Sequence, residues 1–135
     1  VFDPCNPLMT DNRMGEKPYK KQIPWEAYLH LKDLIIYVHI KDGTFIKDTE
    51  GIFPEVDYKY PGQGDADIER IVSDLFTSGY DGGFCIEPHI SNPFCDKMED
   101  SENAELLSFQ FDSFVDYGRR TQELIESIRN SMLSV

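Results

Sequence analysis

One apolar segment, residues 34–40 (LIIYVHI), constrains the fold more than any other part of this 135-residue chain. It is rich in β-branched and aromatic residues and presents apolar side chains on both faces of a strand. Strands of that kind are typical of parallel sheets that are covered by helices. Because parallel strands are joined by crossover connections, we expect helices before and after this segment.

Three helices are expected around this strand. Pro24 suits the first turn of a short helix, whose apolar face would consist of Trp25, Tyr28, Leu29 and Leu31. A second helix is indicated by apolar residues at helical spacing, namely Ile68, Ile71, Val72, Leu75 and Phe76. Gly79 would end this helix. From about Ala104 the chain has the pattern of a helix to near its end, and Gly118 marks a point where that helix would kink or divide.

Residues 83–87 form a further short strand, and residues 1–3 have the character of a strand end. The segments 9–22, 43–64 and 91–103 are rich in glycine, proline or polar residues and are expected to be loops. The order is therefore strand end, helix, strand, helix, strand, helix. Strands that alternate with helices predict an α/β fold with a parallel sheet, in which functional side chains lie at the carboxyl ends of the strands.

Composition limits the classes of partner. The chain carries 25 acidic against 13 basic residues and a formal net charge of −12, so nucleic acid is not an expected partner. No run of residues approaches the roughly 18 apolar residues of a membrane span, and no apolar leader is present, so no membrane partner is expected either. The cysteines Cys5, Cys85 and Cys95 stand at unrelated spacings, which favours reduced thiols in a cytoplasmic protein.

Each of the three strands ends in a side chain that can bind a metal ion: Asp3, His39 and Glu87. Two carboxylates and an imidazole at one sheet edge suit a divalent ion such as Mn²⁺, Mg²⁺, Co²⁺ or Zn²⁺. Each residue alone also has a structural interpretation. An Asp before a proline is often a turn residue, a His in an apolar strand is often a hydrogen-bonded core residue, and a buried Glu is often paired with a cation. Their joint position at three carboxyl ends favours the metal site.

Five short motifs follow one another along the chain: FDPCN at 2–6, YVHIKD at 37–42, PGQGD at 61–65, GYDG at 79–82 and IEPH at 86–89. Together they resemble the sugar phosphate isomerase/epimerase family of xylose-isomerase-like TIM barrels. The resemblance implies that residues 1–135 are the C-terminal portion of a (β/α)₈ barrel, roughly its last three βα units with parallel strands. A complete barrel has about 250 residues. A missing N-terminal half, or self-association of this chain, would then complete the sheet.

The resemblance also implies roles for individual residues. Asp3, His39 and Glu87 match metal-ligand positions of the family, and Glu87 also matches one member of its catalytic acid/base pair. The family's fourth ligand is a Glu from an earlier strand, which would precede Val1. The expected activity is that of a divalent-metal-dependent isomerase or epimerase, which transfers a proton next to a carbonyl of a small sugar or sugar acid through an enediolate.

Three residues near these ligands are candidates for substrate binding: Asn6, Lys41 and His89. Each has an alternative, since Asn6 would also suit a turn, and Lys41 or His89 would also suit a solvent-facing position. The glycines within residues 61–64 are weak evidence for phosphate binding, and a tight loop that leads into the next helix is the favoured interpretation.

Two other functions stay open at this point. The same scaffold supports a metal-dependent dehydratase or lyase that acts on a keto-sugar or keto-inositol, because elimination begins with the same proton abstraction. Alternatively, the chain is a non-catalytic barrel fragment that needs its N-terminal half.

Overall fold

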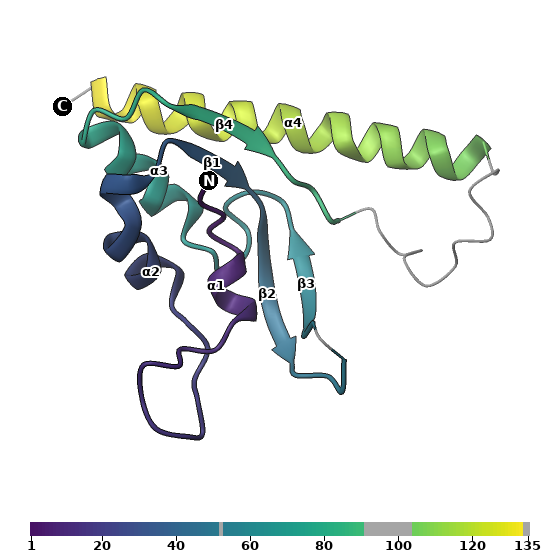
Figure 1. The fold of residues 1–135 in the computed structure, drawn as a ribbon. Coiled ribbons are helices and arrows are strands. Elements are labelled where there is room, and N and C mark those ends of the chain that lie inside the picture. Colours follow the sequence, from purple (N-terminus) through teal and green to yellow (C-terminus); the bar gives the residue numbers. More distant parts are fainter. Residues whose placement is uncertain (52, 91–103, 134–135) are drawn as a thin grey trace.

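The computed structural model describes residues 1–51, 53–90 and 104–133 of the chain. Its helices are α1 (Asn6–Met9), α2 (Pro24–Leu31), the 3₁₀ turn η1 (Lys32–Leu34), α3 (Ile68–Thr77) and α4 (Ala104–Leu133). Its strands are β1 (Tyr37–Ile40), β2 (Asp42–Lys47), β3 (Glu55–Lys59) and β4 (Gly83–Ile86). Figure 1 shows the long helix α4 running along one side of the molecule, next to β4. No described helix is both long and apolar enough to cross a membrane.

Two strands and a short extended segment lie side by side in parallel. β1 pairs with β4, and His39 stands opposite Cys85. On the other edge of β1, the Phe2 N–H donates to the carbonyl of Tyr37 at 2.8 Å, and the His39 N–H donates to the carbonyl of Phe2 at 2.9 Å. The carboxyl ends of all three segments therefore lie at one edge of this small sheet.

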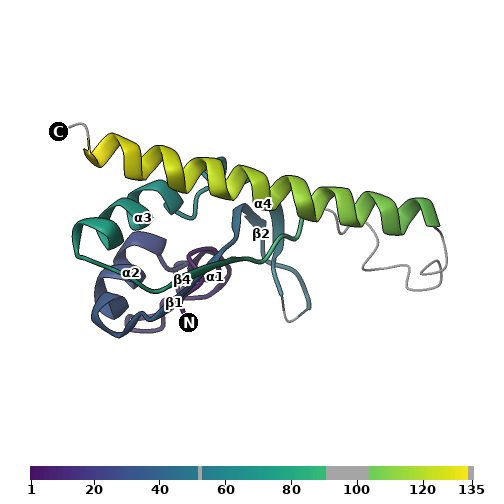
Figure 2. The ribbon, with the colours of Figure 1, turned by 90° about the horizontal axis from the view of Figure 1, so that it is seen from above.

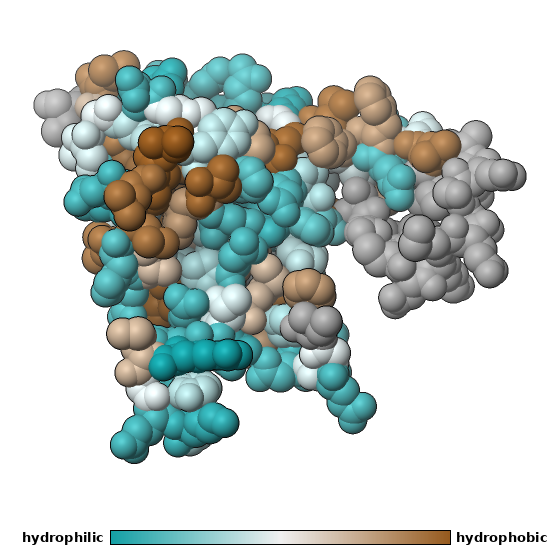
Figure 3. Space-filling model, viewed as in Figure 1, coloured by the Kyte–Doolittle hydropathy of each residue, from teal (hydrophilic) through white to brown (hydrophobic). Residues whose placement is uncertain are grey.

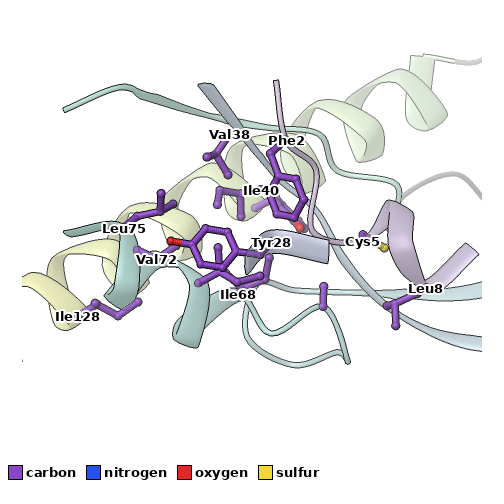
Figure 4. Packing of buried hydrophobic residues seen from close by; sticks show 13 residues of the cluster. Phe2, Cys5, Leu8, Tyr28, Val38, Ile40, Ile68, Val72, Leu75 and Ile128 are labelled. Atoms are coloured by element: carbon purple, nitrogen blue, oxygen red, sulfur yellow. The ribbon is translucent and has the colours of Figure 1, made fainter. Parts of the chain in front are cut away.

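One face of this sheet packs against the helices. Val38 and Ile40 are completely buried, in one cluster with Tyr28 of α2 and Val72 of α3 (Figure 4). Because alternate residues of a strand face opposite sides, His39 points away from this core. Its side chain is 29% exposed, so the described part of the chain leaves the second face of the sheet partly open.

The expectation of a loop over residues 43–64 is wrong for much of that segment. β2 and β3 pair there as an antiparallel hairpin, with Gly43 opposite Tyr58 and Phe45 opposite Val56. In β3, Val56 and Tyr58 alternate with charged residues, which is the pattern of a half-buried strand. The neighbouring glycines and prolines, which usually indicate loops, obscured this short pattern.

β1 is shorter than the apolar segment 34–40 because its pairing partner is short. β4 begins at Gly83, opposite Tyr37, so the residues before Tyr37 have no strand beside them on that edge. Leu34 belongs to η1 instead. Leu34 and Ile36 are 77% and 78% exposed, although an apolar strand segment predicts their burial.

The predicted helices form, with two differences in detail. In α2, Tyr28 is completely buried but Leu29 and Leu31 stay exposed, because only one side of this short helix faces the core. α4 continues through Gly118, where we expected a kink. A Cβ atom at this position would lie 3.4 Å from Cδ1 of Ile86, which is close to an ordinary van der Waals contact.

The first half of α4 extends beyond the body of the molecule (Figures 1 and 2). Its apolar side chains Leu107, Phe111 and Phe114 are exposed, and Figure 3 shows hydrophobic residues along this end of the helix. Further along the helix, Tyr117 and Ile128 are buried in the core cluster. The part of α4 from Tyr117 onward therefore stabilises the described fold by burying apolar surface.

Candidate metal centre

The structure brings Asp3, His39 and Glu87 together at the carboxyl edge of the three parallel segments. One potential ligand atom from each residue lies within 4.8 Å of those of the other two. Asp3 follows the bridge at Phe2, His39 is part of β1, and Glu87 follows β4 directly. The Glu87 N–H donates to the carbonyl of Ile40 at 3.1 Å, which continues the β1–β4 pairing up to the site.

Glu87 is the centre of a network of polar contacts. Its Oε2 atom lies 2.5 Å from Nδ1 of His39. Its Oε1 atom accepts from Nζ of Lys41 at 3.2 Å and lies 3.2 Å from Nε2 of His89. Burial on its own raises the pKa of Glu87, but hydrogen bonds from His89, Lys41 and His39 outweigh it and hold the pKa at about 2. Glu87 is therefore ionised at neutral pH, as a metal ligand or a proton acceptor must be.

Asp3 is buried, and each of its two carboxylate oxygens has a polar partner. Its Oδ1 atom accepts from the backbone N–H of Cys5 at 2.9 Å, which is the turn interaction that an Asp before a proline commonly makes. Its Oδ2 atom forms an ion pair with Nζ of Lys41 at 2.6 Å. A metal ion that binds this oxygen would have to take the place of the ammonium group.

These residues fit a divalent cation of the hard or borderline class. The donor atoms are carboxylate oxygens and an imidazole nitrogen, which Mn²⁺, Mg²⁺, Co²⁺ and Zn²⁺ accept. Two ligands that bind one ion at about 2.2 Å each are at most about 4.4 Å apart. The three ligand atoms, which lie within 4.8 Å of one another, would have to move closer together around one ion.

Cys5, which lies near the site, is not suited to supply a thiolate ligand. Cys5 and Cys85 are free thiols. Burial raises the pKa of Cys5 to about 12, and the carboxylate of Asp3 adds to the effect. Cys5 therefore stays protonated at neutral pH. Cys95 and the expected loop over residues 91–103 lie outside the described residues.

The three predicted substrate-binding residues differ in their surroundings. Asn6 is exposed at the start of α1. Lys41 does not point to solvent, because it is 4% exposed and contacts both carboxylates. His89 is half-buried and its ring stacks on that of Tyr58, with the ring centroids 4.7 Å apart.

Tyr58 is a residue of this site that the sequence interpretation missed. It belongs to β3, and its hydroxyl donates to the sulfur of Met9 at 3.7 Å. Its ring covers His89, which in turn contacts Glu87. The alternating pattern of β3 was the available signal, since it predicts that Tyr58 lies on the inner face of a strand.

The glycine loop next to the site is occupied by Asp42, which follows Lys41 in the sequence. Asp42 is 1% exposed, and its carboxylate accepts from the backbone N–H groups of Gly43, Gly62, Gly64 and Ala66. Those N–H groups are the donors that a phosphate would need. Asp42 thus holds the loop against the start of β2 and directs the chain into α3.

Comparison of the chain with protein-family models, with curated proteins and with solved structures found no match in any of the three. A function for this chain is therefore inferred from the geometry of Asp3, His39 and Glu87, together with the motifs that surround them in the sequence.

Proposed function

We propose that this chain carries the metal-binding part of a divalent-metal-dependent isomerase or epimerase that acts on a small sugar or sugar acid. The observation that carries the proposal is the meeting of Asp3, His39 and Glu87 at one sheet edge, within 4.8 Å of one another. The sequence separates His39 and Glu87 by 48 positions. Side chains of this chemistry rarely gather in a partly buried site without a function or a cation.

Each residue has a defined part in the proposed reaction. A divalent cation, when bound, supplies Lewis-acid polarisation of the carbonyl oxygen of the substrate. Asp3, His39 and Glu87 would hold that cation. Glu87 is ionised and accepts the proton from the carbon next to the carbonyl, while His89 keeps its carboxylate oriented.

The parallel pairing of β1 with β4 is one feature that the proposed barrel origin of the site requires. Three parallel segments present their carboxyl ends together, and helices cover one of their two faces. On the other face, Tyr37 is exposed and Cys85 is half-buried. We infer that further strands, from an N-terminal barrel half or from a second copy of the chain, cover this face in the active protein. Free thiols at Cys5 and Cys85 support a cytoplasmic location.

Calorimetric titration of the chain with Mn²⁺, Mg²⁺, Co²⁺ and Zn²⁺ at neutral pH tests the metal site. We expect saturable binding of one ion per chain. Absence of binding by all four ions would contradict the proposal.

Turnover is then assayed with a panel of keto-sugars and sugar acids, for the chain alone and after addition of an N-terminal barrel half. An unchanged product mass indicates isomerisation, whereas loss of water indicates a dehydratase on the same scaffold.

A metal-binding role without turnover is the second candidate. It is favoured by the number of ligands, because the described residues bring together three of the four that the proposed family uses. Metal binding by the chain alone, with turnover absent in every condition, would support this second candidate.

A further inference from the structure

We propose that Lys41 is the resident cation of this site, whose ammonium group neutralises Asp3 and Glu87 until a divalent ion binds and displaces it. This inference rests on the proposed metal function and adds a statement about how the site is assembled and how tightly it binds metal. Lys41 would then be a positioning residue that competes with the metal ion, in contrast to the substrate contact for which its place in the sequence makes it a candidate.

The position of the ammonium group is the first argument. Nζ of Lys41 lies 2.6 Å from Oδ2 of Asp3 and 3.2 Å from Oε1 of Glu87. These two carboxylates are also potential ligands of the metal centre. A single cationic group thus bridges two of the three side chains that a metal ion would bridge.

Burial is the second argument. The side chains of Lys41 and Asp3 are only 6% and 5% exposed, so water screens their electrostatic attraction only weakly. A buried carboxylate without a cation is strongly unfavourable, and two neighbouring carboxylates repel each other as well. The ammonium group of Lys41 contacts both carboxylates and is therefore placed to neutralise the site.

The metal and the ammonium group exclude each other on electrostatic grounds. A divalent ion that binds Oδ2 of Asp3 takes the atom that Lys41 contacts most closely. The two positive charges of the ion would also lie within a few ångströms of the positive charge of Lys41, which is unfavourable in a partly buried site. The long side chain of lysine allows Nζ to move away while Asp3 and Glu87 stay in place.

The place of Lys41 in the chain supports this exchange. It lies between β1 and β2, directly after the last residue of β1. The residues on either side are fixed, since Ile40 is buried in the core and Asp42 holds the glycine loop. The backbone is therefore anchored, and displacement needs to involve only the side chain.

The test compares Lys41→Met with Lys47→Met in the full 135-residue chain. Lys47 is a matched control because it lies in β2, is 67% exposed and forms an ion pair with Glu55 at the surface. Two quantities are measured for each variant and for the unaltered chain: the dissociation constant for Mn²⁺ by calorimetry, and the midpoint of thermal unfolding without metal.

We expect Lys41→Met to bind Mn²⁺ at least about tenfold more tightly, because no ammonium group has to be displaced. Its unfolding midpoint without metal should fall by about 5 °C or more, since the carboxylates lose their counter-charge, and Mn²⁺ should restore it. Lys47→Met should change neither quantity. Lys41→Arg, which keeps the charge, should retain the stability of the metal-free chain and the weaker binding of Mn²⁺.

Other outcomes separate this inference from the proposed function. If Lys41→Met binds Mn²⁺ no more tightly than the unaltered chain, the inference is wrong and the metal site stands. If Lys41→Met is unfolded without metal but folds with Mn²⁺, the inference is supported. If it stays unfolded even with saturating Mn²⁺, Lys41 is a structural residue and the inference is wrong. Absence of binding by all variants would contradict the metal site itself.

Discussion

The Nδ1 atom of His39 lies 2.5 Å from Oε2 of Glu87, although the two residues are 48 positions apart in the sequence. The parallel pairing of β1 with β4 produces this contact. His39 stands opposite Cys85, and Glu87 follows on the same face two residues later. The relationship between His39 and Glu87 is therefore set by strand register, and predictions about the site depend on it.

Substitution of His39 by alanine should weaken Mn²⁺ binding about tenfold or more. Loss of a direct metal ligand should lower the affinity at least as much as loss of a residue that only hydrogen-bonds to a ligand. The dissociation constant, measured by calorimetry, checks this. His30→Ala is the matched control, since His30 is an exposed histidine on α2 that contacts the carbonyl of Glu26. Equal affinity of the two variants would exclude His39 as a ligand.

Glu87→Gln should lower turnover of the assembled enzyme by about 100-fold or more while the fold is kept. Glutamine has nearly the shape of glutamate but cannot accept the proton from the substrate. Initial rates with the substrate found in the panel are the measurement, and circular dichroism reports the fold. Retention of more than about a tenth of the activity would count against an acid/base role for Glu87.

Gly64→Ala should destabilise the chain by about 1–3 kcal/mol. A Cβ atom at this position would lie 2.5 Å from the backbone nitrogen of Gly43 and 2.7 Å from its carbonyl oxygen, so the backbone has to shift. The shift would also disturb the hydrogen bond from Gly64 to Asp42. Urea unfolding measures the effect. Gly15→Ala is the control, because no atom lies within 4 Å of a Cβ placed there, and similar stabilities of both variants would contradict this account.

Stability should fall in acid in part through Asp74, which joins α2 to α3. The hydroxyl of Tyr28 donates to Oδ2 of Asp74 at 2.7 Å, and this hydrogen bond, together with Lys32, lowers the pKa of Asp74 below its usual value. Because the pKa is lower in the folded state, the stabilisation is complete above the unfolded-state pKa of about 3.9 and is lost as the pH falls through the folded-state value.

Asp74→Asn keeps an acceptor for Tyr28 but removes the titration. Its free energy of unfolding should therefore decrease less than that of the unaltered chain between about pH 5 and about pH 2. Urea unfolding at several pH values checks this. Asp112→Asn, at an exposed position of α4, is the control and should follow the unaltered chain. The prediction fails if Asp74→Asn and the unaltered chain lose stability in parallel.

Local sequence patterns predict an element when the signal for it lies within the element itself, without a pairing partner from another segment. The spacing of Ile68, Ile71 and Val72 predicts α3, and all three side chains are buried. The β2–β3 hairpin was missed because its stability depends on pairing across a loop, and Gly43 and Pro54 within it resemble loop residues. Tyr58 was missed with it, because the hairpin places this residue at the site.

The sequence by itself determined which side chains are available at the strand ends, since Asp3, His39 and Glu87 follow or lie in extended apolar segments. Only the tertiary structure decided that these three side chains meet, because their separation depends on the register between strands that are far apart in the sequence. It also decided the position of Lys41. The local pattern leaves a lysine at a strand end free to face solvent, whereas two neighbouring carboxylates in a site with little water draw it inward.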